Sequence, residues 1–266
     1  MLGSPVHSAA GGYEITRVSV FDNPQVRVIL LDIEGTTTPI DFVYKTLFPY
    51  ANRNLESFLS EHSRDPEIRS LIDDLHAQQQ IDERQGLEPP AWVNEPEGER
   101  LLSAEEYSLW LMAADSKCTT LKSLQGRIWQ EGFGNGELRG EVYADVPVAF
   151  ERWRRQGREI AIYSSGSVLA QQLLFRTVIS GDLTLLIVGF FDTGVGIKSD
   201  AGSYKKIAAS LGHETREVLF VSDAAKEVVA AQAGGMHAVL CDREARGSSS
   251  SVEGAAIHSF DEIFPE

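Results

Sequence analysis

The amino-acid sequence predicts an α/β protein in which a doubly wound, Rossmann-like parallel sheet forms the core and a mostly α-helical cap is inserted into it. Two observations carry this prediction. Short, β-branched apolar runs alternate with helical patterns over the second half of the chain, which is typical of a parallel sheet with helices on both faces. One such run comes much earlier, and the long stretch that follows it has helical periodicity.

The early apolar run, VRVILLDIEG, predicts the first strand, buried on both faces and ending in an acidic residue and a glycine. It opens the core domain, to which we assign residues 26–40 and 145–266. The residues before it, 1–25, are largely polar and contain several Gly and Ser residues, so we expect a flexible lead-in there.

Residues 41–144 are expected to form the helical cap. Asp65 and Pro66 match the N-cap and the first position of a helix. Ser103, followed by Glu106, matches a capping box, and this pattern predicts that another helix starts at Ser103.

The second part of the core contains three further predicted strands, in the segments REIAIYSS, EVLFVSD and HAVLCD. Helical patterns lie between these segments, as the alternation of a doubly wound domain requires. Near the end of the chain, the composition of RGSSSSVEG predicts a short flexible loop.

The chain has 266 residues and a formal net charge of −15, and 42% of its residues are hydrophobic, which suffices for a buried core. The acidic balance argues against nucleic acid but does not exclude a small phosphate ester. The apolar runs are too short to span a bilayer. Cys118 and Cys241 form neither a disulfide framework nor a zinc spacing. We therefore expect a cytoplasmic protein that binds no nucleic acid and no membrane.

Polar side chains follow the ends of three predicted strands, and a lysine lies in a loop between two of them. The carboxyl ends of parallel strands meet at one edge of a sheet, where α/β proteins bind their ligands, so we expect these side chains to lie together. In chain order they are Asp32, Glu34, Ser164, Ser165, Lys198 and Asp223.

These residue types suit phosphoryl transfer, which requires a positioned nucleophile and neutralised phosphoryl charge. Asp32 and Asp223 offer hard oxygen ligands for one Mg²⁺. The two serines, with N–H groups at the start of the next helix, form an anion cradle, and Lys198 adds a positive charge. Glu34 can act as an acid and then as a base. Glu227, one helical turn after Asp223, is either a surface residue or a partner that supports the metal ligands.

Each of these residues alone is more often a turn, cap or surface residue, so the prediction depends on their combination and order. That combination resembles the haloacid dehalogenase superfamily of phosphatases. Its motifs read here as DIEGT, SSGS, GIK and SDAAKE. The second acid of the first motif is usually Asp in the superfamily, and this chain has Glu34 instead. Glu34 at this position is typical of the enolase-phosphatase family of methionine salvage, which the chain resembles over about residues 26–243. The resemblance is specific in the runs DIEGTTTPI and FDTGVGIKSDAGSYKKIA.

The resemblance implies a Mg²⁺-dependent phosphatase with a helical cap of the C1 type over its active site. Asp32 would attack phosphorus to form an aspartyl-phosphate, and Glu34 would transfer protons. One Mg²⁺ per subunit would lie on Asp32, Glu34 and Asp223, where Glu34 can contribute its backbone carbonyl. The residues implied to contact the substrate are Ser164, Ser165 and Lys198.

The implied reaction is bifunctional. 2,3-Diketo-5-methylthiopentyl-1-phosphate is enolised and then dephosphorylated to the acireductone 1,2-dihydroxy-3-keto-5-methylthiopentene. Two alternatives stay open: another Mg²⁺-dependent phosphatase of the superfamily, acting on a sugar phosphate or a phosphoamino acid, and a receiver-like module that carries a phospho-Asp as a signal. The base that removes the C1 proton is not identified, and Glu34 is a candidate. We expect a monomer.

Overall fold

The structure is a computed structural model that describes residues 21–244 and 256–266. Its sheet has five parallel strands in the order β3-β2-β1-β4-β5, as predicted for a doubly wound core. The strands are β1 (Val28–Leu31), β2 (Glu159–Tyr163), β3 (Ile187–Phe191), β4 (Val218–Ser222) and β5 (His237–Leu240).

The first strand of the chain, β1, occupies the centre of the sheet. All four of its residues are buried, as expected for a strand covered on both faces. Val28 lies opposite Glu159 of β2 and Val218 of β4, so the three strands run in step. The residues that follow these strands therefore leave the sheet at the same edge.

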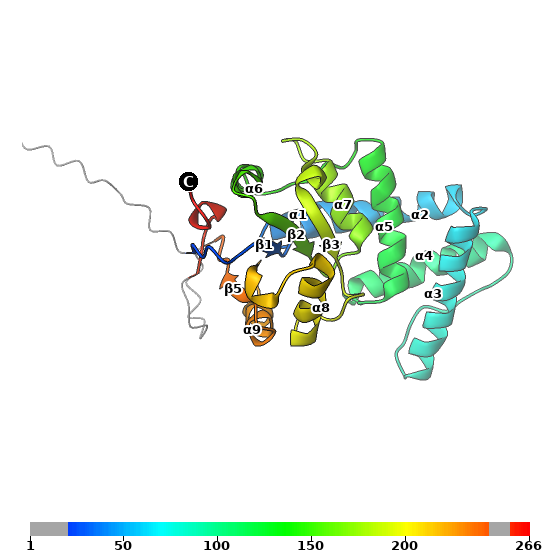
Figure 1. The fold of residues 1–266 in the computed structure, drawn as a ribbon. Coiled ribbons are helices and arrows are strands. Elements are labelled where there is room, and N and C mark those ends of the chain that lie inside the picture. Colours follow the sequence, from blue (N-terminus) through cyan, green and yellow to red (C-terminus); the bar gives the residue numbers. More distant parts are fainter. Residues whose placement is uncertain (1–20, 245–255) are drawn as a thin grey trace, which may run out of the picture.

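Helices cover both faces of the sheet (Figure 1). Alternate residues of β1 point to opposite faces. Ile29 and Leu31 belong to a core cluster with α6 and α7, whereas Val28 and Leu30 belong to a second cluster with α8 and α9. The helices are α6 (Asp145–Arg155), α7 (Val168–Arg176), α8 (Ala201–Leu211) and α9 (Ala225–Ala233).

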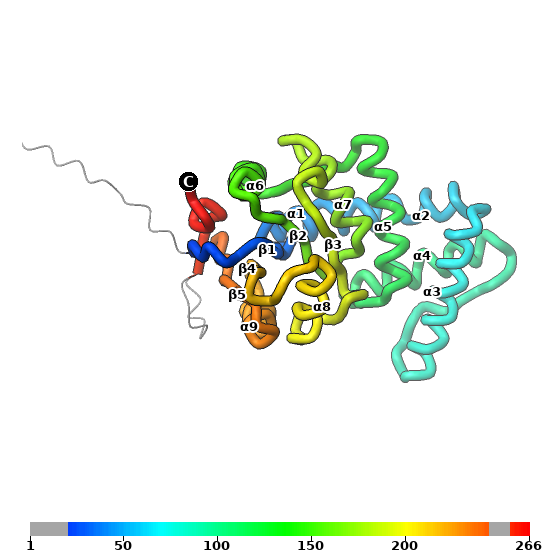
Figure 2. The backbone as a smooth tube through the Cα atoms, in the orientation of Figure 1, coloured from blue at the N-terminus to red at the C-terminus, as the bar shows by residue number. Residues whose placement is uncertain are grey.

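Between β1 and α6 the chain forms a group of helices at one end of the sheet (Figure 2). It enters this group through a short helix α1 (Ile40–Phe42) and a π-helical turn at Val43–Leu47. The four helices are α2 (Phe48–Glu61), α3 (Pro66–Arg84), α4 (Glu97–Ala113) and α5 (Thr119–Gly134). They share one continuous apolar cluster with α6 and α7. The boundaries that we assigned to cap and core stay a prediction.

One of the two predicted helix starts in this region is confirmed and the other is wrong. Helix α3 begins at Pro66, and the Asp65 carboxylate accepts a hydrogen bond from Glu67 N at 2.8 Å. Helix α4 begins at Glu97, so Ser103 lies inside it and caps nothing. The Ser103 hydroxyl instead donates to the carbonyl of Glu99, one turn earlier, at 2.9 Å. A serine inside a helix that donates to the preceding turn can also be followed by Glu three residues later, so the sequence pattern alone does not distinguish it from an N-cap.

We did not predict β3 from the sequence, although Ile187–Phe191 is rich in β-branched and aromatic residues. β3 is an edge strand with intermediate and exposed side chains, so it lacks the fully apolar pattern of β1. A 3₁₀ turn at Leu183–Leu186 leads directly into it and obscures the boundary in the sequence.

The flexible lead-in that we expected falls mostly on residues 1–20, which lie outside the described residues, as does the predicted loop 246–254. At Phe21 the expectation is wrong, because Phe21 forms a parallel bridge with Ile263 near the end of the chain. Arg152 and Trp153 of α6 donate hydrogen bonds to carbonyls of the same terminal segment. The remaining short 3₁₀ turns are Thr215–Glu217 and Phe260–Glu262.

Within the described ranges, no helix has the length and apolar character needed to cross a membrane.

Gly140, on the return path from α5 to α6, gives a testable prediction for folding. A Cβ at this position would overlap the carbonyl of Leu174 in α7, and the Gly140 N–H donates to Thr177 Oγ1 at 2.9 Å. We expect Gly140→Ala to lower the free energy of unfolding by about 1–3 kcal/mol, because backbone atoms must move. Urea titration measures this change. Gly134→Ala, where a Cβ meets no atom within 4 Å, is the matched control and should not destabilise the protein. Equal stability of both variants would contradict the prediction.

Candidate active site

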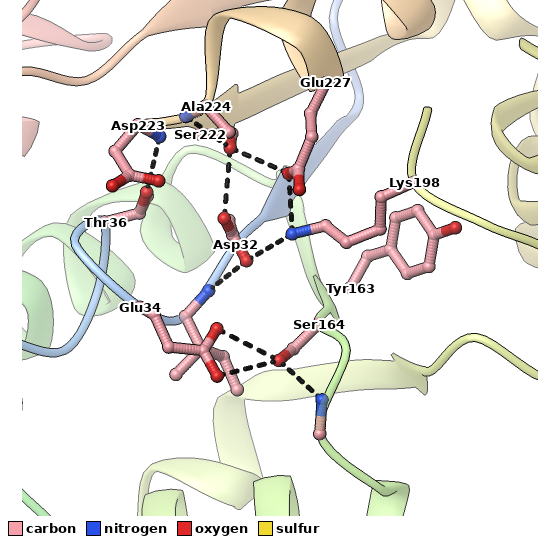
Figure 3. A network of polar contacts seen from close by, with 12 residues as sticks. Asp32, Glu34, Thr36, Tyr163, Ser164, Lys198, Ser222, Asp223, Ala224 and Glu227 are labelled. Carbon is pink, nitrogen blue, oxygen red and sulfur yellow. Dashed lines mark hydrogen bonds and ion pairs between the residues drawn. The ribbon is translucent and has the colours of Figure 1, made fainter. Parts of the chain in front are cut away.

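Asp32 follows β1 directly and is held in place by three hydrogen bonds to its buried carboxylate (Figure 3). Its Oδ1 accepts from Ile33 N at 2.7 Å and from Lys198 Nζ at 2.6 Å, and its Oδ2 accepts from Ser222 Oγ at 3.0 Å. Its backbone N–H continues the sheet by donating to the Val221 carbonyl. The carboxylate therefore has a fixed position at the edge where a ligand would bind.

Lys198 connects Asp32 to Glu227 of α9. Its ammonium lies 2.6 Å from a carboxylate oxygen of each, and the lysine side chain is only 9% exposed. Burial would lower the pKa of Lys198, but the two carboxylates outweigh that effect and raise the pKa above its ordinary value. The hydroxyl of Tyr204 donates to the Lys198 carbonyl at 2.7 Å and fixes the loop. Lys198 is therefore a permanent buried cation.

Glu227 also lies 2.9 Å from Ser222 Oγ, so that hydroxyl contacts two carboxylates. Burial, followed by the charge of Asp32, raises the pKa of Glu227 to about 7. Of the two roles that we considered for Glu227, the surface role does not fit, because its side chain is 19% exposed and binds the lysine. Ser222 was not among the predicted residues. The sequence signal that could have identified Ser222 is its position at the end of a predicted strand, directly before Asp223.

The carboxylate of Glu34 points away from Asp223 and toward Ser164 (Figure 3). Ser164 Oγ lies 3.3 Å from the nearer Glu34 oxygen and accepts a hydrogen bond from Gly166 N. Burial and the neighbouring charge of Asp32 both raise the pKa of Glu34. A raised pKa favours the protonated form of the carboxyl group, which is the form that a general acid uses.

A cavity of about 630 Å³ begins beside Glu34 and the loop after β2 and extends under the cap helices. Ser164 and Ser165 both line this cavity together with Glu34, and Ser164 also contacts the Glu34 carboxylate. The lining also includes polar side chains such as Asn52 and Arg53 of α2. Many of the other lining side chains are apolar and come from α2, α4, α5, α7 and the π-helical turn. The main ones are Leu47, Phe48, Leu109, Met112, Trp129 and Leu174.

Comparison with known proteins identifies the family of this fold and site. Residues 26–235 match the model of the haloacid dehalogenase-like hydrolases. Enolase-phosphatase E1 of Synechococcus elongatus is 45% identical over 238 residues, which cover 90% of this chain and 98% of that protein. The same enzyme of Sorangium cellulosum is 43% identical, with 90% and 97% covered. This chain belongs to the haloacid dehalogenase-like hydrolases and, within them, to the enolase-phosphatase E1 family.

Solved structures agree with this assignment of fold. The crystal structure of the UTR4 protein from Saccharomyces cerevisiae has a TM-score of 0.67 and 32% identity, and covers 88% of this chain and 96% of that chain. CbbY from Rhodobacter sphaeroides, in complex with phosphate, has a TM-score of 0.53 at 13% identity, which supports the fold alone.

Phosphatases of the haloacid dehalogenase type generally use Mg²⁺, and the oxygen atoms at the strand ends fit this ion. A Cβ at Gly35, which has a φ of +70°, would overlap the Asp223 carboxylate, so that carboxylate lies against the backbone next to Glu34. Thr36 Oγ1 accepts from Asp223 N at 3.0 Å and helps to hold it there. No three acidic, His or Cys side chains gather into a metal site among the described residues. Because Mg²⁺ usually takes only one or two carboxylates, Asp32 and Asp223 are sufficient acids.

Glu227 gives a prediction for the pH dependence of stability in metal-free enolase-phosphatase. Its ordinary pKa of 4.5 is raised to about 7 in the folded state. Between these values the folded chain keeps a proton that the unfolded chain has released, so this stabilisation is present below pH 4.5 and is lost as the pH rises through 7. Relative to Glu227→Gln, we expect the wild-type free energy of unfolding to fall by on the order of 2 kcal/mol over that range.

Urea unfolding in EDTA at several pH values measures this difference. Glu151→Gln, on an exposed part of α6, is the control and should follow the wild-type curve. Parallel curves for wild type and Glu227→Gln would refute the prediction.

Proposed function

We propose that this chain is a bifunctional enolase-phosphatase, which converts 2,3-diketo-5-methylthiopentyl-1-phosphate to the acireductone 1,2-dihydroxy-3-keto-5-methylthiopentene and phosphate. The observation that carries the proposal is the buried Asp32, fixed by Lys198 and Ser222, close to the acid Glu34, which lines a cavity with many apolar side chains. Relatives named enolase-phosphatase E1, 40–45% identical over 90% of the chain, support the substrate.

In the phosphatase step, Asp32 attacks phosphorus and forms an aspartyl-phosphate. Lys198, held 2.6 Å from Asp32, neutralises charge on the phosphoryl oxygens, and Ser164 and Ser165 bind the phosphoryl group by hydrogen bonds. Asp32, Asp223 and the Glu34 backbone carbonyl would hold Mg²⁺, which would supply further neutralisation of the charge on a phosphate ester.

Glu34 serves both halves of the reaction, because the proton to be removed and the ester oxygen that departs belong to the same carbon, C1. As a base it takes the C1 proton, which the C2 carbonyl makes acidic. As an acid it then gives a proton to the leaving oxygen, and afterwards it activates the water that hydrolyses the aspartyl-phosphate. Its raised pKa and its position at the mouth of the cavity support these roles.

The apolar side chains that line the cavity suit the methylthioethyl tail of the proposed substrate. A thioether buried against Leu, Met and Trp side chains is removed from water without losing hydrogen bonds. Our expectations of one Mg²⁺ per chain, a monomer, a cytoplasmic location and no nucleic-acid partner belong to this proposal. The oxygen ligands at the strand ends support the metal, and the acidic composition supports the absence of a nucleic-acid partner.

Replacing the nucleophile tests the phosphatase half. We expect Asp32→Asn to lower phosphate release by at least ~10³-fold, because an amide cannot form the aspartyl-phosphate. Free phosphate is measured with the diketo phosphate and Mg²⁺. Asp41→Asn changes an exposed carboxylate of α1 that pairs with Lys45, and it should keep wild-type activity. Substantial turnover by Asp32→Asn would remove Asp32 from this role.

The two halves separate when enol absorbance and free phosphate are followed in the same reaction. Wild type should form the enol before phosphate appears, and Glu34→Gln should slow both signals by ~10²-fold or more. Glu61→Gln, at the exposed end of α2, is the control. Phosphate release by wild type with no enol signal would favour the alternative of a phosphatase for another ester. A lasting phospho-Asp without turnover would favour a signalling module.

A further inference from the structure

Helix α5 presents two polar side chains to the cavity that have few or no partners within the protein. Lys122 and Gln125 lie three residues apart, so they occupy the same face of the helix. Both line the cavity of about 630 Å³ that also contacts Glu34 and Ser165. They therefore face the place where a substrate attached to the phosphate site would extend.

Lys122 has unused hydrogen-bond donors. Its Nζ lies 3.5 Å from the Ser165 carbonyl oxygen, at the long limit for a hydrogen bond. None of the ion pairs found among the described residues involves Lys122. Lys117, also at the cavity, instead contacts both carboxylate oxygens of Asp115 at 2.9 Å. Because an ammonium group has three donors, at least two of those on Lys122 have no partner among the described residues and are available to a ligand in the cavity.

Gln125 has only 5% of its surface exposed and lines the cavity, and no hydrogen bond to its side-chain amide is found among the described residues. The amide is not one of the buried polar atoms that lack a partner in those residues, so it is open to the cavity and can bind a ligand there. Helix α5 comes close to the core at this point, since a Cβ at Gly126 would lie 3.8 Å from Ser167 Oγ, in the loop that follows β2.

We infer that Lys122 and Gln125 form a dicarbonyl clamp, which binds the two neighbouring carbonyl oxygens of the substrate by hydrogen bonds. The inference depends on the proposed function. With the phosphate at Asp32 and C1 beside Glu34, the next atoms toward the cap are C2 and C3 and their oxygens. Two donors one helical turn apart match two oxygens on adjacent carbons, and apolar side chains line the same cavity for the rest of the substrate.

The clamp also acts on the enolisation step. Glu34 takes the C1 proton, the electron pair of the C–H bond forms the C1–C2 double bond, and the carbonyl pair moves onto the C2 oxygen. The ammonium of Lys122 stabilises the negative charge that develops there, in a cavity partly shielded from water. Gln125 binds the C3 oxygen and keeps the two carbonyl groups coplanar with the new double bond.

The test compares two substrates with the full chain and Mg²⁺: the diketo phosphate and pentyl phosphate, which has a similar length and no carbonyl. We expect Lys122→Met to lower kcat/KM for enol formation by ~10–100-fold and Gln125→Leu by ~10-fold, because each removes one donor to a charged or polar oxygen. Phosphate release from pentyl phosphate should stay within ~2-fold of wild type. Lys122→Arg, which keeps the charge, should recover part of the loss.

Lys205→Met and Gln130→Leu are the matched controls, since both residues are exposed, on α8 and α5, and neither lines the cavity. Thermal unfolding confirms that each variant folds, and Lys122→Gln replaces Lys122→Met if that one does not. An equal loss on both substrates, or no loss on either, would overturn the clamp. If wild type forms no enol but releases phosphate, the proposed function fails instead. The clamp is then judged by whether Lys122→Met raises KM for the diketo phosphate and not for pentyl phosphate.

Discussion

The rest of the site depends on one buried cation, Lys198, placed between Asp32 and Glu227 at 2.6 Å from each. Burying charges is costly unless they are paired, and one ammonium cannot balance two carboxylates. Asp223, at the adjacent strand end, adds a third. The strand ends therefore carry an excess of negative charge, which a divalent cation can neutralise. In this way a chain with a net charge of −15 can offer a local environment that accepts a phosphate ester.

The sheet order explains why these charges meet. β1 lies between β2 and β4, so Asp32, Ser164 and Ser222 leave the same edge from three adjacent strands. The helices inserted after β1 do not disturb this arrangement, because both ends of the insertion lie side by side: Tyr143 N donates to the Thr37 carbonyl at 3.0 Å. Arg243 strengthens the junction by donating to the Thr36 carbonyl and to Asp145.

Strand-end chemistry could be predicted from the sequence because β-branched runs and their terminal polar residues are local signals. Features that depend on the direction of a side chain or on a tertiary contact could not be predicted from the sequence. The hydroxyl of Ser222 gains its role only when Asp32 and Glu227 approach it from other elements. The capping-box pattern at Ser103 fits both a helix start and a helix interior. The edge strand β3 lacks the burial that marks β1, and the unpaired amide of Gln125 matters only beside the cavity.

The substitution of Glu34 for the usual Asp has a physical consequence in this site. The backbone position next to Gly35 is independent of side-chain length, so the carbonyl of residue 34 can serve a metal with either acid. The extra methylene lets the carboxylate extend to Ser164, 3.3 Å away, at the mouth of the cavity. There it faces the substrate between the phosphate end and α5. A longer acid thus brings the carboxylate closer to Ser164 and the cavity, where the proposed transfer of the C1 proton would take place.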